Sequence, residues 1–113
     1  GLLVWGDLYW TESPPEPLAR VMALTNACTP LADWTTAAGA AGLEVLDIHV
    51  ADDATWDAYV ATMDRAARDW IAAHPGRIER PHIEATADRV RSFLTFARPY
   101  TGFALQLMRK PAP

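Results

Sequence analysis

The last apolar stretch of the chain, residues 101–110, constrains the fold most, because its composition is typical of a β-strand with packing groups on both faces. Successive side chains of a strand point to opposite faces of the sheet. The two alternating sets are Phe103, Leu105 and Leu107 on one face and Ala104, Gln106 and Met108 on the other. A strand of this kind is usually an interior strand covered on both sides. We therefore expect it in the middle of a sheet.

Two further stretches are predicted to be strands, residues 2–5 and residues 43–50. The first should stop at Gly6-Asp7, a pair of residues typical of turns. The second has two faces of different character. Its stricter apolar face would carry Leu46, Ile48 and Val50, and the other face Leu43, Val45 and Asp47.

Helical periodicity predicts about four helices, at about residues 17–27, 30–41, 55–73 and 83–97. Thr29 is a suitable N-cap with Pro30 as the first helical residue. Gly42 is placed to end the second helix in a left-handed conformation, and Asp53 or Thr55 can cap the third. The apolar stripe expected on the third helix is Trp56, Tyr59, Val60, Met63, Ala67, Trp70 and Ile71. The fourth helix should turn Ile83, Ala87, Val90, Leu94 and Ala97 inward, with Phe93 and Phe96 widening that face.

The long helical connection between the first two strands favours a parallel relation between them. The third strand has the most apolar groups on both faces, so we place it between the other two, antiparallel to both. The predicted sheet then has the order first, third, second. The edge of the first strand would have no partner, and an apolar free edge invites pairing.

The composition excludes several classes of protein. The 113 residues suffice for one domain. The net charge is -4 and the basic residues are scattered, which argues against nucleic-acid binding. No apolar run approaches the roughly 18 residues that cross a membrane. The single cysteine, Cys28, fits a reducing compartment, and we expect a cytoplasmic protein.

The chain opens at Gly1, without Met and inside a predicted strand. Domain termini tend to lie at the surface and to fray. Either an initiator segment was removed, or a longer N-terminal part is missing, or Gly1 is the remnant of a tag before a genuine terminus. Our expectation is the missing N-terminal part.

The chain resembles the C-terminal part of class I S-adenosylmethionine-dependent methyltransferases, in particular a family of small bacterial ones. The motifs, in order, are Gly-Leu-Leu-Val-Trp-Gly-Asp-Leu-Tyr-Trp at 1–10, the Gly-Leu strand at 42–50, Trp-Asp-Ala-Tyr at 56–59 with Trp70 further along, and Tyr-Thr-Gly-Phe-Ala at 100–104 with the strand closing on Lys110. The resemblance covers nearly the whole chain, and the order and spacing of the motifs carry it.

This resemblance implies an α/β fold in which the three strands are the fifth, sixth and seventh of a Rossmann-like methyltransferase sheet. It implies one domain, residues 1–113, that is the C-terminal half of that fold and lacks the cofactor-binding N-terminal half. The cofactor site of the family needs a Gly-rich turn after the first strand, and no G-x-G is present here. We expect S-adenosylmethionine in the intact enzyme and no cofactor on this chain alone.

Ligands of open α/β sheets bind outside the carboxyl ends of the strands. Tyr9 and Trp10, just past the predicted first strand, are candidates for an aromatic wall of the substrate site. The alternative is that both fold down over the core. Asp7 is a candidate substrate partner or proton acceptor, with a turn cap as the alternative.

Trp56, Asp57 and Tyr59 come from the segment that would cover the opposite side of the substrate. Core packing is the alternative role for Trp56, and a charge that favours the helix start is the alternative for Asp57. The arginines at 65, 68, 77, 80, 89 and 91 are expected on solvent-exposed helix faces. No metal site is predicted, because His49, His74, His82 and Cys28 do not have metal-ligand spacing.

Two functions follow. The first is a substrate-side C-terminal fragment of a methyltransferase that acts on a small molecule and is inactive alone. The second is a stand-alone, non-catalytic module that binds a small apolar ligand or forms a homodimer through the edge of residues 2–5. Neither nucleic acid nor a membrane is an expected partner.

Overall fold

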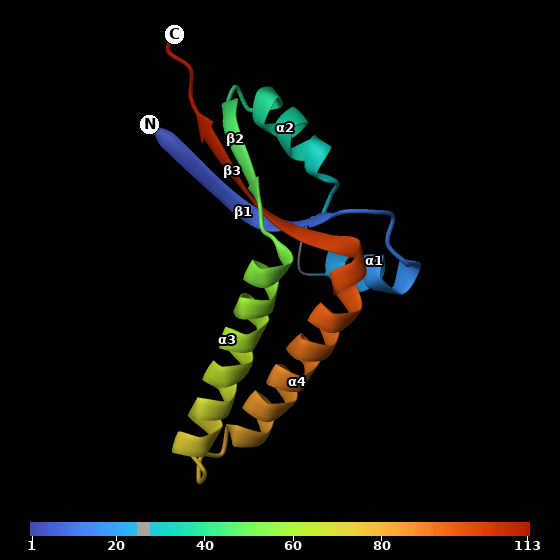
Figure 1. Ribbon diagram of the computed structural model, residues 1–113, viewed down its shortest axis with the longest axis vertical. Helices are drawn as coiled ribbons and strands as arrows, with labels where there is room; N and C mark the ends of the chain where they lie inside the picture. Colours follow the sequence, from blue (N-terminus) through green and yellow to red (C-terminus); the bar gives the residue numbers. More distant parts are fainter. Residues whose placement is uncertain (25–27) are drawn as a thin grey trace. The chain divides into compact units, whose positions relative to one another are not determined.

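The computed structural model describes residues 1–24 and 28–113 (Figure 1). The end of the first predicted helix, residues 25–27, lies outside the described residues. The elements in chain order are β1 (Leu2–Trp10), α1 (Glu16–Ala23), α2 (Leu31–Ala40), β2 (Glu44–Val50), α3 (Asp53–Ala73), α4 (Arg80–Ala97), a 3-10 turn (Arg98–Tyr100) and β3 (Thr101–Arg109). Three strands and four helices agree with the expected α/β class.

The three strands form one sheet in the order β1-β3-β2, with β3 in the middle and antiparallel to both neighbours. In the β1–β3 pair, Leu2 lies opposite Arg109 and Trp10 lies opposite Thr101. The predicted order and the central place of the last strand are confirmed. The apolar character of β3 explains this place, because an interior strand has both of its edges paired.

The predicted end of the first strand is wrong, because β1 continues through Gly6 and Asp7 to Trp10. Every residue of this extension pairs with β3. Gly6 does not mark a turn. It makes room for β3, since a Cβ built on Gly6 would lie 2.5 Å from Leu105 Cδ2. Strand pairing has here overridden the local turn preference of Gly-Asp.

A β-bulge between Val45 and Asp47 corrects the predicted faces of β2. The bulge adds one residue to the strand and exchanges the faces beyond it. Val45 pairs with Met108 and Ile48 pairs with Gln106, so these two residues share a face. Leu46, which we predicted on the same face as Ile48, is 40% exposed.

One face of the sheet carries the core of Tyr9, Trp34 and Ala104, with Leu31 and Ile48 packed against it. Two of these residues come from α2, which lies along the sheet in Figure 1. The other face of β3 remains partly open, since Phe103 is 36% and Leu105 is 41% exposed. The expectation that both faces of β3 are covered is therefore wrong for this chain.

The second helix begins later than predicted. Pro30, and not Thr29, is the N-cap residue of α2, and no side chain caps the helix. Gly42 does adopt the predicted left-handed conformation, with φ 74°. This conformation turns the chain from α2 into β2, because glycine has no Cβ to clash there.

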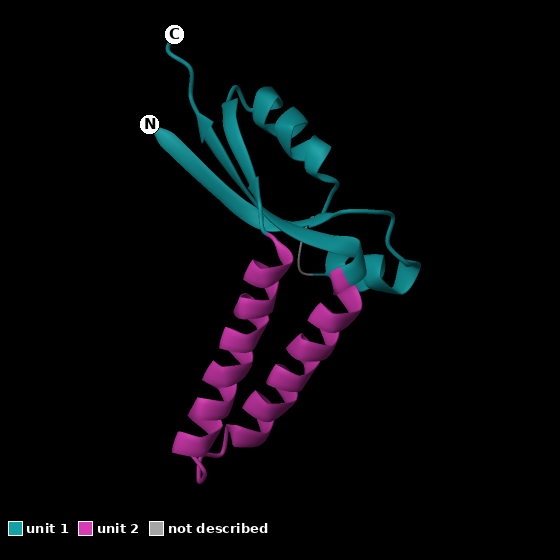
Figure 2. Cartoon of the chain, viewed as in Figure 1, with its two compact units in different colours: residues 1–51, 99–113 teal, residues 52–98 magenta. Residues whose placement is uncertain are grey.

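The chain divides into two compact units, which are coloured separately in Figure 2. We call residues 1–51 and 99–113 the sheet unit and residues 52–98 the hairpin unit, and we describe each by itself. The hairpin unit consists of α3 and α4, which run side by side (Figure 1). Within the described residues, no helix has the length and apolar character that a membrane span requires.

The start of α3 also differs from the prediction. Asp52 is the N-cap, and its side chain accepts a hydrogen bond from the Thr55 backbone N–H at 2.8 Å. The predicted apolar faces of α3 and α4 are confirmed in part. Trp56 and Ala97 are buried, whereas Tyr59 is 55% and Phe96 is 52% exposed. These two aromatic side chains do not contribute to a core in this chain.

Candidate functional site

Asp7 lies near the middle of β1 and is half-buried. Its Oδ1 accepts a hydrogen bond from the Leu8 backbone N–H at 2.7 Å. The predicted turn cap is excluded because Asp7 is part of a strand. Its carboxylate remains a candidate for a substrate contact.

Tyr9 and Trp10 belong to the strand and do not follow it. The Tyr9 ring is buried edge-on against Trp34, with 6.3 Å between ring centroids. It also covers Gly102, where an added Cβ would lie 2.5 Å from the Tyr9 ring. The core alternative therefore describes Tyr9 better than an exposed aromatic wall. Trp10 is half-buried at the end of β1, where its backbone N–H donates to the Thr29 carbonyl oxygen.

A hollow of about 430 Å³ lies beside β1 within the sheet unit. Its lining includes Asp7, Asp33, Trp5, Trp34 and Gln106. Gln106 is 3% exposed, its amide N–H₂ donates to Met108 Sδ, and its Oε1 has no hydrogen-bond partner within the described chain. Most of the remaining lining is aliphatic, and none of the described lining residues is basic.

Cys28 is half-buried in the sheet unit. Burial raises the pKa of its thiol to about 11, and the nearby negative charge of Asp7 adds to the shift. A thiol with so high a pKa is a poor nucleophile at neutral pH. This environment makes covalent catalysis by Cys28 unfavourable.

In the hairpin unit, Trp56 and Asp57 share one partner, Arg98. The Arg98 guanidinium carbon lies 5.0 Å from the centroid of the Trp56 ring, in a cation–π contact. Arg98 Nη2 also lies 3.3 Å from one carboxylate oxygen each of Asp53 and Asp57. Asp57 is therefore an ion-pair partner of Arg98 and not only a charge near the helix start.

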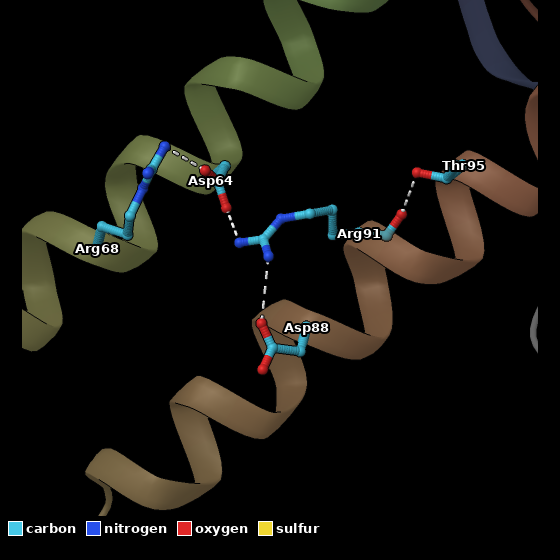
Figure 3. A network of polar contacts seen from close by, with 5 residues as sticks. All are labelled: Asp64, Arg68, Asp88, Arg91 and Thr95. Carbon is cyan, nitrogen blue, oxygen red and sulfur yellow. Dashed lines mark hydrogen bonds and ion pairs between the residues drawn. The ribbon is translucent and has the colours of Figure 1, made fainter.

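A charge network links α3 to α4 (Figure 3). Asp64 of α3 accepts from Arg68 on its own helix and from Arg91 on α4. Arg91 Nη1 also lies 3.3 Å from Asp88 Oδ1. The hydrogen bond to Asp64 raises the pKa of Arg91 above its ordinary value. Arg68 and Arg91 therefore do more than cover the solvent-exposed helix faces on which they were predicted.

Two adjoining hollows flank this network. The first, which we call the apolar groove, has about 210 Å³ and is lined mainly by aliphatic side chains of α3 and α4. The second, which we call the arginine hollow, has about 530 Å³ and includes Trp56, Asp57 and four arginines. Both include Asp64 and Arg91 in their walls.

The six predicted site residues thus fall into two groups. Asp7, Tyr9 and Trp10 lie in the sheet unit, and Trp56, Asp57 and Tyr59 lie in the hairpin unit. Trp56 and Asp57 line the arginine hollow, whereas Tyr59 does not. Arg98 and Asp64 were missed by the sequence reasoning. The i, i+4 spacing of Asp64 and Arg68 was a usable signal, but the pairing of Asp64 with Arg91 depends on the hairpin. No cluster of potential metal ligands occurs among residues 1–24 and 28–113.

No protein-family model matches the chain, and no curated protein matches it. Solved structures do. A S-adenosylmethionine-dependent methyltransferase from Geobacter sulfurreducens, in complex with S-adenosyl-L-homocysteine, aligns with a TM-score of 0.80 and 25% identity over 98% of this chain and 46% of that one. The chain has the fold of a portion of a class I methyltransferase.

Two further structures agree in fold. A S-adenosylmethionine-dependent methyltransferase from Thiobacillus denitrificans, also in complex with S-adenosyl-L-homocysteine, aligns with a TM-score of 0.79 and 21% identity over 98% of this chain and 46% of that one. YjhP from E. coli aligns with a TM-score of 0.77 and 22% identity over all of this chain and 47% of that one. The chain therefore spans about half the length of each of these three structures.

The glycines of this portion do not form a holder for the cofactor. Among the described residues, the only positive φ belongs to Gly42, which leads from a helix into a strand. A cofactor-binding glycine turn of this fold class leads from a strand into a helix. In the part of the chain that the structure describes, no positive-φ glycine lies in such a turn.

Proposed function

We propose that this chain is the substrate-side, C-terminal portion of a S-adenosylmethionine-dependent methyltransferase that acts on a small molecule. The observation that carries the proposal is the sheet order β1-β3-β2, with an antiparallel middle strand, in a chain that aligns with about 46% of a methyltransferase. Among the described residues, no glycine turn leads from a strand into a helix. This supports the same division, because the part that binds the methyl donor would then lie in other residues.

The exposed edge of β1 gives independent support. Leu2, Leu3, Val4 and Trp5 are between 48% and 70% exposed, although they form a regular strand. Long apolar edge strands are usually covered in native proteins. Further strands of a methyltransferase sheet would pair with this edge and bury these side chains.

In the proposed enzyme, this chain binds and orients the methyl acceptor and excludes water from it. In the hairpin unit, taken by itself, Trp56 and Asp57 both contact Arg98 and are candidate contacts for the acceptor, and Tyr59 is exposed enough to reach a ligand. In the sheet unit, taken by itself, Asp7 is the candidate to accept a hydrogen bond or a proton, and Trp10 at the end of β1 is the candidate aromatic contact. Orientation of this kind is a large part of the catalysis of a displacement reaction.

The test begins with the coding sequence directly upstream of Gly1. An in-frame segment with a Gly-rich strand-turn-helix motif supports the proposal, and a start codon at or beside Gly1 contradicts it. The complete polypeptide should then consume S-adenosylmethionine in the presence of an acceptor. Asp7→Asn and Trp56→Ala should lower turnover at least ten-fold, whereas Glu16→Gln, an exposed position at the start of α1, should leave it unchanged.

The exposed β1 edge also favours a second candidate, a stand-alone module that dimerises through this strand. Two antiparallel copies of β1 would join two sheets into one and bury both apolar edges. Light scattering distinguishes the candidates. A dimer whose formation is abolished by Val4→Pro supports the module, because proline removes a backbone donor. A strictly monomeric chain contradicts it.

A further inference from the structure

The two helices of the hairpin unit leave their shared apolar stripe incompletely packed. Val60, Met63 and Ala67 of α3 line the apolar groove together with Ile83, Ala87, Val90 and Leu94 of α4. None of these seven side chains is fully buried, and Val90 is 38% exposed. An amphipathic helix normally buries this stripe against a neighbour. The groove of about 210 Å³ therefore offers an apolar surface that a ligand can cover.

The adjoining arginine hollow has the opposite character. Four arginines and two aspartates belong to its lining. Arg91 and Arg98 also pair with Asp88 and Asp53, so the positive charge that remains for a ligand is that of Arg65 and of the exposed Arg68. These two guanidinium groups favour an anion over a cation at this place.

Two of the arginines are available to such an anion. Arg65 has no ion-pair partner among the residues that the structure describes. Arg68 pairs with Asp64, but 71% of its side chain is exposed, and exposed pairs contribute little to stability. Both can turn to a carboxylate or phosphate, for which the guanidinium fork has a matching geometry.

The two hollows share part of their walls, namely Val60, Leu94 and the Asp64–Arg91 pair that links the helices. Figure 3 shows this pair between α3 and α4. A single molecule could therefore place an apolar part in the groove and a negative group among the arginines.

From this juxtaposition we propose that the hairpin unit binds a small amphipathic anion, with a short apolar body and one carboxylate or phosphate group. Its identification as the methyl acceptor rests on the function proposed above. The binding itself does not, because every residue invoked belongs to residues 52–98. The size of the apolar groove fits part of a ligand and not a whole drug-sized molecule, whose pockets have about 300 to 1,000 Å³.

The test uses the 113-residue chain, octanoate as probe, and octylammonium as a probe of equal length and opposite charge. Titrations followed by ¹H–¹⁵N correlation spectra should show saturable shifts on α3 and α4 with octanoate. Octylammonium should bind at least ten-fold more weakly. No saturable shift at about 10 mM octanoate, shifts outside the hairpin, or equal binding of the two probes would overturn the proposal.

Variants separate the two parts of the site. The double substitution Arg65→Gln/Arg68→Gln should weaken octanoate about ten-fold and leave 1-octanol unaffected. Ala87→Trp, which fills the groove, should weaken both probes. Arg89→Gln is the matched control, because Arg89 is on the same hairpin but does not line either hollow. Unchanged octanoate affinity in a folded double variant contradicts the proposal.

The result is independent of the methyltransferase assay. Octanoate binding is measured without a methyl donor, so the proposal of this site would still hold if the complete polypeptide were inactive. Conversely, if the complete polypeptide transfers methyl groups but the hairpin unit does not bind octanoate, only this inference is contradicted.

Discussion

In the sheet unit, β3 brings together residues from the two ends of the chain. Leu2 lies opposite Arg109, and the buried core joins Tyr9, Trp34 and Ala104. In the hairpin unit, two helices that are neighbours in sequence pack along a stripe with few fully buried residues. Of the ion pairs formed by the described residues, all but Arg20–Glu16 and Arg109–Glu44 lie in the hairpin unit.

This difference indicates what stabilises each unit. Strand pairing and apolar burial hold the sheet unit, and salt does little to weaken such burial. Charge pairs contribute a larger share in the hairpin unit, and salt screens them. The unit with the looser packing is also the one with the two adjoining hollows. Ligand-binding regions are commonly drawn from the less stable parts of a protein.

The largest predicted effect on stability comes from a substitution in the aromatic core of the sheet unit. Trp34→Ala should lower the free energy of unfolding by about 3 to 5 kcal/mol, because it deletes a large buried side chain and leaves a cavity. Urea titration followed by circular dichroism measures this. Trp5→Ala is the control, since Trp5 is 52% exposed and its loss should cost less than about 1 kcal/mol. Equal costs would contradict the assignment of the core.

Two glycine positions in the sheet unit, Gly102 and Gly6, should tolerate an added Cβ to different degrees. Gly102→Ala should cost about 1 to 3 kcal/mol, because a Cβ there meets the Tyr9 ring, which Trp34 and the core hold in place. Gly6→Ala should cost less, since the nearest atom is the end of the partly exposed Leu105 side chain, which can move. Thermal unfolding of both variants tests this, and the reverse order would contradict it.

Breaking the charge network should affect mainly the hairpin unit. Asp64→Asn should destabilise it by about 0.5 to 1 kcal/mol, a low value because Arg68 and Arg91 are substantially exposed. Amide hydrogen exchange should become faster on α3 and α4 and stay unchanged on β1 and β3. The effect should fall in about 1 M salt. A uniform change across both units would show that they do not respond separately.

Near neutral pH, the smallest effect on stability concerns Cys28. Its pKa of about 11 compares with an ordinary value of 9.0, so at about pH 8 its alkylation by iodoacetamide should be about 100-fold slower than in urea. Because the folded thiol holds its proton more tightly, the stabilisation is complete below about pH 9. It is lost as the pH rises toward about 11. Equal alkylation rates in the folded and unfolded chain would contradict the burial of Cys28.

The sequence predicted the features that depend on long patterns. The central place of β3 followed from its apolar character, and the left-handed Gly42 followed from the end of a helical pattern. It could not predict the features that depend on a partner. Gly6-Asp7 has the preference of a turn, and only pairing with β3 keeps it in a strand. The β2 bulge likewise has no local signal in Val45–Asp47.

The candidate site was predicted less completely than the fold. Trp56 and Asp57 were chosen from a motif, but Arg98, which fixes both, is 41 residues or more away in sequence. Tyr9 was expected at the end of a short strand, and the longer strand carries it into the core instead. A local pattern shows which residues can do chemistry, but the tertiary pairing decides which of them meet.

The most direct test of the account is a calorimetric titration of the 113-residue chain with S-adenosylmethionine. The chain carries the fold of part of a methyltransferase without a glycine turn, among its described residues, that could hold the donor. We expect no binding heat up to about 1 mM ligand, a concentration that would reveal even weak complexes. Saturable binding with a dissociation constant in the micromolar range would contradict the account, because the donor site would then lie within these residues.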